Sequence, residues 1–113
     1  MPLSNRGYLD GKDIFEEHRV LVHVVLMKFS DAADAAEAKT RLEKLVGAVP
    51  AIRSLRVHLD ELHTEVSWHL HLVTTHRDAE DLRAYQQHPA HLELGVWLRP
   101  LLAARAVVDY TEN

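Results

Sequence analysis

Cysteine is absent from the sequence. Without thiols the chain has no disulfide framework, no thiolate nucleophile and no cysteine-based zinc site. Glycine and proline are also sparse, with 4 residues of each among 113, while hydrophobic residues make up 47% of the chain. This composition is typical of one folded globular domain and excludes collagen-like and disordered chains.

The sequence also lacks a long apolar run and a basic stretch. The longest nearly apolar segment, VLVHVVLM at 20–27, is too short to cross a bilayer, and the N-terminal MPLSNRGYLDGKD has no apolar signal core. The formal net charge is −4, whereas a surface that follows phosphates needs a cationic stripe. We therefore expect a cytoplasmic protein that binds neither nucleic acid nor membrane.

Histidine, by contrast, is abundant, with 9 residues in the chain. It is the side chain whose ordinary pKa, about 6.5, lies near physiological pH. Two of the histidines flank a proline in YQQHPAHLELG at 85–95, one helical turn after a tyrosine. The histidines are therefore the first candidates for functional residues.

Hydrophobic periodicity predicts four strands. The β-branched run at 20–29 predicts a strand covered on both faces. Apolar and polar residues alternate at 53–60 and again at 67–75, as in half-buried strands, and a short β-branched segment at 105–110 predicts the last strand.

Three helices are predicted between these strands. The first has helical spacing through residue 46 and begins at the capping-box pair Asp34 and Glu37. Asp78 caps the second, which breaks at His88 because the residue before a proline avoids the helical region. Pro89 then starts the third. The order βαββααβ favours a ferredoxin-like α+β fold, an antiparallel sheet with helices on one face.

With these elements placed, four segments together resemble the stress-responsive A/B barrel (Dabb) family: VHVVLMKF at 22–29, VPAIRSLRVH at 49–58, YQQHPAH at 85–91 and VVDY at 107–110. The family forms dimeric α+β barrels in which two ferredoxin-like sheets face each other. The resemblance therefore implies a homodimer. We expect one domain over 19–111, preceded by a flexible N-terminal arm at 1–18, which carries the turn signals NRG and LDGK without sustained periodicity.

The same family includes plant-type polyketide cyclases, olivetolic acid cyclase-like members that close a linear polyketide by intramolecular aldol condensation without a cofactor. Carried over to this chain, the resemblance implies that His91 is the general base and Tyr85 its partner. It further implies that His23 and His69 orient the substrate or relay protons. The expected protein is thus a cofactor-free cyclase with a polyketide-like substrate.

The chemistry of these residue types agrees with such roles. A neutral imidazole can remove a proton from a methylene between two carbonyls, and a phenol can donate a hydrogen bond to the resulting enolate. In the first turn of a helix, the positive end of the helix dipole would disfavour protonation of His91. The expected substrate-binding residues are His88, Met27, Phe29 and Trp97, although the last three types more often pack in a core.

Other interpretations remain open. HPAH could be a helix-to-helix corner in which His88 caps the new helix and His91 bonds a carbonyl, in a non-catalytic stress-responsive barrel. Related barrels also carry cofactor-free and haem-binding monooxygenases. The pairs His69 with His71 and His88 with His91 have ligand-like spacing, but no carboxylate stands at an obvious third position, so no metal is expected. Three further histidines, at 58, 63 and 76, are expected on or near loops and solvated.

Overall fold

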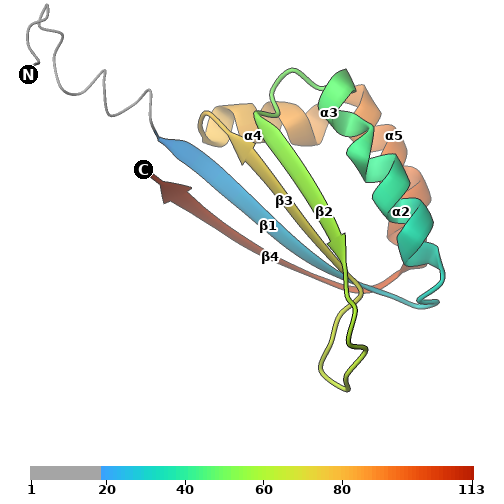
Figure 1. The fold of residues 1–113 in the computed structure, drawn as a ribbon. Helices are drawn as coiled ribbons and strands as arrows, with labels where there is room; N and C mark the ends of the chain where they lie inside the picture. The colour runs from blue at the N-terminus through green and yellow to red at the C-terminus, as the bar shows by residue number, and fades with distance from the viewer. Residues whose placement is uncertain (1–18) are drawn as a thin grey trace, which may run out of the picture.

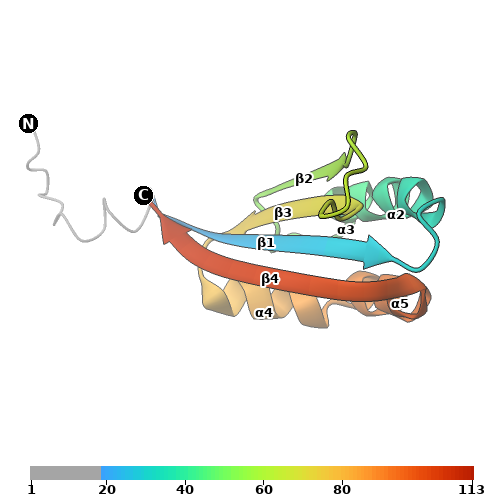
Figure 2. The ribbon, with the colours of Figure 1, turned by 90° about the horizontal axis from the view of Figure 1, so that it is seen from below.

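The computed structural model describes residues 19–113, and the predicted arm at 1–18 lies outside the described residues. A four-stranded antiparallel sheet carries the helices on one face (Figures 1 and 2). The elements in chain order are β1 (Val20–Phe29), α2 (Asp34–Glu43), α3 (Leu45–Ala48), β2 (Ser54–Leu59), β3 (Leu70–His76), α4 (Ala79–Gln87), α5 (Pro89–Leu98), a 3-10 turn (Arg99–Leu101) and β4 (Leu102–Glu112). The strands are ordered β2-β3-β1-β4, which confirms the predicted ferredoxin-like α+β fold.

Alternation along β1 decides which side chains lie beneath the helices. His23, Val25 and Met27 are buried on that face, whereas Leu26 and Lys28 are exposed on the other. Burial of apolar side chains on one face is what fixes the register of such a strand. The prediction that this strand is covered on both faces therefore holds for one face only in the single chain.

The region predicted as one helix forms two, α2 and α3. The predicted capping box is wrong, because Ala33 stands at the cap position and makes no side-chain cap hydrogen bond. Asp31 instead accepts a hydrogen bond from the Ala33 N–H at 3.0 Å, so the chain turns before Asp34 is reached. Exposed Val46 lies in the short α3 and contributes little to the core.

The corner between α4 and α5 follows the prediction closely. Asp78 caps α4 by accepting a hydrogen bond from the Asp81 N–H at 2.9 Å. His88 has extended backbone angles, φ −66° and ψ 139°, and Pro89 is the first residue of α5. His88 also caps α5, because its Nδ1 accepts from the Ala90 N–H at 3.0 Å. This corner places His91 in the first turn of α5.

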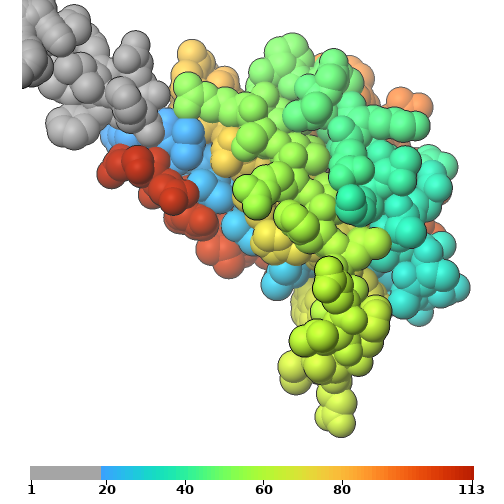
Figure 3. Space-filling model, in the orientation of Figure 1, coloured from blue at the N-terminus to red at the C-terminus, as the bar shows by residue number. Residues whose placement is uncertain are grey.

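The main core lies between the sheet and the helices. It contains fifteen buried hydrophobic residues, among them Phe29, Leu42, Leu70 and Tyr85. The last strand is longer than the predicted 105–110 because β4 pairs with β1 over almost its whole length. The loop after β2 projects from the body of the molecule (Figure 3). Among residues 19–113, no helix has the length and apolar character needed to cross a membrane.

Candidate active site

A small cavity of about 50 Å³ lies between the helix-facing side of the sheet and α5. Three of the four predicted catalytic residues line it, namely His91, Tyr85 and His23. Met27, a predicted substrate-binding residue, also forms part of its wall. The remaining lining residues are Val25, Leu42, Leu72, Leu94, Gly95, Leu98, Arg99, Leu102 and Arg105. The wall is thus mostly apolar, with two histidines, one phenol and two guanidinium groups.

Tyr85 and His91 are in direct ring contact. Their centroids are 4.7 Å apart and their planes stand at 73°, an edge-to-face arrangement. Tyr85 is only 1% exposed. The Nδ1 atom of His91 is buried and has no hydrogen-bond partner within residues 19–113. Such an unpaired buried polar atom is uncommon in folded proteins.

Burial changes the protonation behaviour of both rings. The pKa of His91 is lowered, first by burial and then by the positive charge of Arg99, while a hydrogen bond of the ring with the Gln86 backbone carbonyl acts in the opposite direction. Burial raises the pKa of Tyr85 to about 12. At neutral pH the site therefore holds an uncharged imidazole beside a protonated phenol, which is a base beside a hydrogen-bond donor.

A carboxylate orients the third residue of the cavity. Nδ1 of the buried His23 lies 2.5 Å from Oδ1 of Asp109. The strand register explains this pairing, because His23 and Asp109 stand opposite each other on β1 and β4. Sequence analysis missed Asp109. Its signal was the aspartate of VVDY, together with the expected pairing of first and last strands in a ferredoxin-like sheet.

The fourth predicted catalytic residue lies elsewhere. His69 stands just before β3, where its Nδ1 accepts a hydrogen bond from the Phe29 N–H at 2.8 Å. The ring of Phe29 is 6.1 Å from the ring of His69, and Phe29 itself is buried in the core. The structure therefore does not bring His69 or Phe29 to the cavity that contains His91.

Two more predicted substrate-binding residues lie outside this cavity. The ring nitrogen of His88 is engaged in capping α5. Trp97 packs at the edge of the core, and the guanidinium carbon of Arg41 lies 4.1 Å from the centre of its ring. Arg99 and Arg105, which sequence analysis did not single out, occupy the wall instead.

His76 is the histidine whose predicted environment is wrong. Solvation was expected, but the side chain is 0% exposed at the end of β3. Its Nδ1 lies 2.9 Å from the Ala51 carbonyl, which can only accept, so Nδ1 donates. Its Nε2 then accepts from the Thr74 hydroxyl at 2.8 Å. The loop before β2 covers the end of β3, which local sequence does not reveal.

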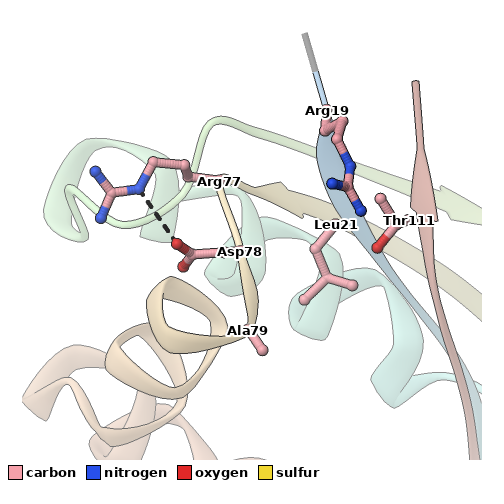
Figure 4. Close-up of a pocket in the computed structure, with 6 residues that line it drawn as sticks. All are labelled: Arg19, Leu21, Arg77, Asp78, Ala79 and Thr111. Carbon is pink, nitrogen blue, oxygen red and sulfur yellow. Dashed lines mark ion pairs between the residues drawn. The ribbon is translucent and has the colours of Figure 1, made fainter. Parts of the chain in front are cut away.

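A second hollow lies near the start of β1 and the end of β4 (Figure 4). This groove has a volume of about 510 Å³ and is lined by Arg19, Leu21, Arg77, Asp78, Ala79 and Thr111. Arg77 forms an ion pair with Asp78, with Nε and Oδ2 3.5 Å apart. Among residues 19–113, its lining has no histidine or tyrosine, so the described part of the chain places no acid–base group there that titrates near neutrality.

The remaining strand histidine is not arranged for metal binding. His71 lies beside His58 of β2, with ring centroids 6.2 Å apart. No group of three or more histidine, aspartate or glutamate side chains in the described part of the chain is placed to hold a metal ion. Within residues 19–113, the histidine pairs with ligand-like spacing therefore have no third ligand beside them.

Solved structures of similar fold come from several bacteria and from two plants. A dimeric ferredoxin-like protein of unknown function from Thermobifida fusca is 24% identical, with a TM-score of 0.74, over 83% of this chain and 92% of that one. A dimeric protein of unknown function from Bacteroides fragilis is 28% identical, with a TM-score of 0.72, over 80% and 94%. A hydroxynitrile lyase from Passiflora edulis is 14% identical, with a TM-score of 0.72, over 83% and 94%.

No curated protein matches the sequence significantly. The family model described as the stress responsive A/B barrel domain matches residues 21–112, which is most of the chain. This range begins in β1 and ends with β4, so it includes every element of the sheet and the whole His91 cavity. The chain therefore belongs to the stress responsive A/B barrel (Dabb) domain family.

Proposed function

We propose that this protein is a cofactor-independent acid–base enzyme that closes a ring in a polyketone-like substrate by an intramolecular aldol reaction. The observation that carries the proposal is the buried Nδ1 of His91, which has no partner within residues 19–113 although its ring lines a cavity. Leaving a buried polar atom unpaired costs about 1–3 kcal/mol. A buried ring nitrogen without a partner beside a cavity is best explained by a hydrogen bond or proton transfer to a bound ligand.

In the first step, the neutral imidazole of His91 removes a proton from a methylene group between two carbonyls. The phenol of Tyr85 donates a hydrogen bond to the enolate oxygen as negative charge develops there. The enolate carbon then attacks a distal carbonyl carbon, forming one carbon–carbon bond and an alkoxide. Returning the proton from the imidazolium to the alkoxide restores His91. His23, oriented by Asp109, relays protons between His91 and the substrate.

The size of the cavity limits how a substrate can enter. A volume of about 50 Å³ is close to that of one or two water molecules, which occupy about 30 Å³ each in the liquid, whereas ligand pockets usually measure about 300–1,000 Å³. Substrate binding must therefore displace part of the wall. Met27, Leu72 and Leu98 are fixed in the core, but Arg99 and Arg105 are exposed. These two side chains can change rotamer toward solvent and so enlarge the cavity.

A lyase of known structure shares this fold. The protein from Passiflora edulis is named a hydroxynitrile lyase, and its backbone matches this one closely. At 14% identity the likeness concerns the fold alone, so it supports the scaffold and not the substrate. The choice of an aldol reaction rests on the resemblance of YQQHPAH and its surroundings to cyclase members of the family.

We also infer that the protein works as a homodimer. The similar proteins from Thermobifida fusca and Bacteroides fragilis are described as dimeric. The sheet face opposite the helices exposes apolar side chains, with Val108 62%, Tyr110 47% and Leu26 40% exposed. A second sheet packed on this face would bury them. Sedimentation equilibrium should give twice the chain mass of 12.9 kDa, and a monomer at micromolar concentration would contradict the inference.

A second candidate is a non-catalytic stress-responsive barrel whose dimer is the functional unit. The small volume of the His91 cavity is the observation that favours it. In that case Tyr85 and His91 would contribute only their ring contact to the packing of α4 against α5.

The test compares the wild-type protein with His91→Ala on methyl 3,5,7-trioxooctanoate. This triketo ester can close a six-membered carbocycle between its second and seventh carbons. Wild-type protein should accelerate appearance of the cyclic product over the uncatalysed rate, and the variant should lose at least about 100-fold of that acceleration. The thermal unfolding midpoint should fall only modestly. Equal loss of stability and of rate would favour the non-catalytic candidate.

A further inference from the structure

Two arginines from separate elements line the His91 cavity. Arg99 follows α5 in the 3-10 turn, and Arg105 lies on β4 in register with Met27. Arg41 and Arg77 form ion pairs with nearby carboxylates, with distances of 2.9 Å and 3.4 Å for the closest pair of each. Within residues 19–113, by contrast, neither Arg99 nor Arg105 forms an ion pair with a carboxylate. The carboxylate nearest to them along β4, Asp109, is bonded to His23.

The position of Arg99 depends on a glycine one helical turn earlier. A β-carbon built on Gly95 would lie 2.8 Å from Nη1 of Arg99 and 3.0 Å from Nη2. The guanidinium group therefore occupies the space that any other residue at position 95 would fill. Gly95 is itself part of the cavity wall. The chain thus leaves room for a planar cation directly over the face of α5 that borders the cavity.

Both cations are close enough to act on the base. The positive charges of Arg99 and Arg105 each contribute to the lowered pKa of His91. A cation that destabilises an imidazolium also attracts an anion bound at the same place. Guanidinium groups present several N–H donors in one plane and commonly bind a carboxylate through two parallel hydrogen bonds.

We propose that Arg99 and Arg105 bind a carboxylate of the substrate at the mouth of the His91 cavity, so that a polyketone acid is preferred over the corresponding neutral ester. The assignment of the cavity to a polyketone rests on the function proposed above. Engagement of the carboxylate draws the Arg99 guanidinium away from Gly95. This movement opens the wall toward His91 and admits the ketone-bearing chain.

Binding is tested first with a stable ligand pair that needs no turnover. The full-length protein is titrated by calorimetry with 4-oxopentanoate and with its methyl ester, which share a ketone and a short chain but differ in charge. The carboxylate should bind at least about tenfold more tightly than the ester, and raising the salt concentration should reduce this preference. Equal binding of the two ligands, or binding of neither, would overturn the proposal.

Substitutions then test whether Arg99 and Arg105 cause the preference for the carboxylate over the ester. Arg99→Gln and Arg105→Gln should each reduce binding of 4-oxopentanoate by about tenfold and leave binding of the ester unchanged. Gly95→Ala should not weaken carboxylate binding, because the new methyl group displaces the Arg99 guanidinium in the same direction as the bound carboxylate does. Arg83→Gln is the matched control, since Arg83 is an exposed arginine on α4 that does not line the cavity. A loss with Arg83→Gln as large as that with Arg99→Gln would contradict a specific site.

Kinetics separates this inference from the proposed function. If the protein cyclises 3,5,7-trioxooctanoate, Arg99→Gln should raise KM for the acid about tenfold and leave KM for its methyl ester unchanged. Equal KM values for acid and ester in the wild type would refute the anion site while leaving the cyclase proposal intact. Arginine-dependent binding of 4-oxopentanoate, together with no cyclisation of 3,5,7-trioxooctanoate or its methyl ester, would support the anion site and refute the cyclase proposal.

Discussion

His76 and His91 contact the same tyrosine but differ in how their ring nitrogens are used. The ring centroids lie 5.1 Å and 4.7 Å from that of Tyr85, respectively. Both nitrogens of His76 are hydrogen-bonded, one to the Ala51 carbonyl and the other to the Thr74 hydroxyl. His91 instead lines a cavity and has a buried nitrogen with no partner in the part of the chain that the structure describes.

This difference shows why a pKa shift alone does not identify a catalytic histidine. Burial is the first cause of a lowered pKa at both residues. The shift is therefore common to a residue that completes the core and to one that borders a cavity. The hydrogen-bond partners separate them, because a satisfied ring has no lone pair to offer a substrate, whereas an unsatisfied one does. His76 is accordingly interpreted as structural and His91 as the candidate base.

The largest predicted effect in this comparison is on stability. His76→Ala should lower the free energy of unfolding by about 3 kcal/mol, because it removes a buried ring and leaves the Ala51 carbonyl and the Thr74 hydroxyl without partners. His91→Ala should lower it by less, about 1–2 kcal/mol, since the ring is only half-buried and what is lost is its contact with Tyr85. Urea denaturation of the two variants measures both values. Equal losses would erase the distinction between the two histidines.

The tyrosine shared by both rings can be changed without removing its packing. Tyr85→Phe retains the contacts with His76 and His91 and deletes only the hydroxyl. If that hydroxyl stabilises the enolate, kcat should fall by about 100-fold, while the free energy of unfolding changes by less than about 1 kcal/mol. Steady-state kinetics and denaturation test the two parts. An unchanged kcat would restrict Tyr85 to a structural role.

A smaller effect is expected on the pH dependence of the rate. The folded-state pKa of His91 lies below its ordinary value of 6.5, so the neutral base should be fully available above pH 6.5 and be lost as pH falls through that lowered pKa. Arg99→Gln removes a cation that lowers this pKa, so the acid limb of kcat/KM should move toward higher pH. An acid limb that stays in place would show that another group controls the rate.

The lowered pKa of His91 should also make the free energy of unfolding depend on pH, and this dependence can be measured independently of activity. Below pH 6.5 the unfolded chain protonates His91 while the folded chain does so only at a lower pH. The unfolded state therefore binds more protons, and the free energy of unfolding should decrease as pH falls from 6.5 toward the folded pKa. His91→Ala should make this decrease smaller than in the wild type, in denaturation curves recorded over that pH range.

Local sequence was sufficient to locate the four strands, though not all of their ends, and the corner that carries His91. Proline restricts the residue before it and favours the first helical position, so His88 and Pro89 define the end of α4 and the start of α5 within two residues. The alternation at 67–75 likewise identified the buried face of β3. These signals depend on neighbours in the chain, which is why they could be interpreted without a structure.

Features that depend on distant contacts were missed or misplaced. His76 was expected in solvent because the strand was expected to end one residue earlier, and its burial depends on the loop around Ala51. Asp109 meets His23 only through the register of β1 and β4. The spacing of Gly95 and Arg99 is visible in the sequence. The Arg99 side chain folds back over Gly95, however, and this conformation depends on its surroundings and could not be predicted from the sequence. His69 lies just outside β3, where its bond to the Phe29 N–H could not be predicted.

The most direct measurement is the exchange of the central methylene protons of 2,4-pentanedione for deuterium, followed by proton NMR in heavy water. It isolates proton removal from ring closure and requires no knowledge of the natural substrate. The wild-type protein should accelerate this exchange, and His91→Ala should abolish the acceleration while His76→Ala, in its folded fraction, retains it. Exchange that is equally fast with wild-type protein and with His91→Ala would contradict the assignment of His91 as the base.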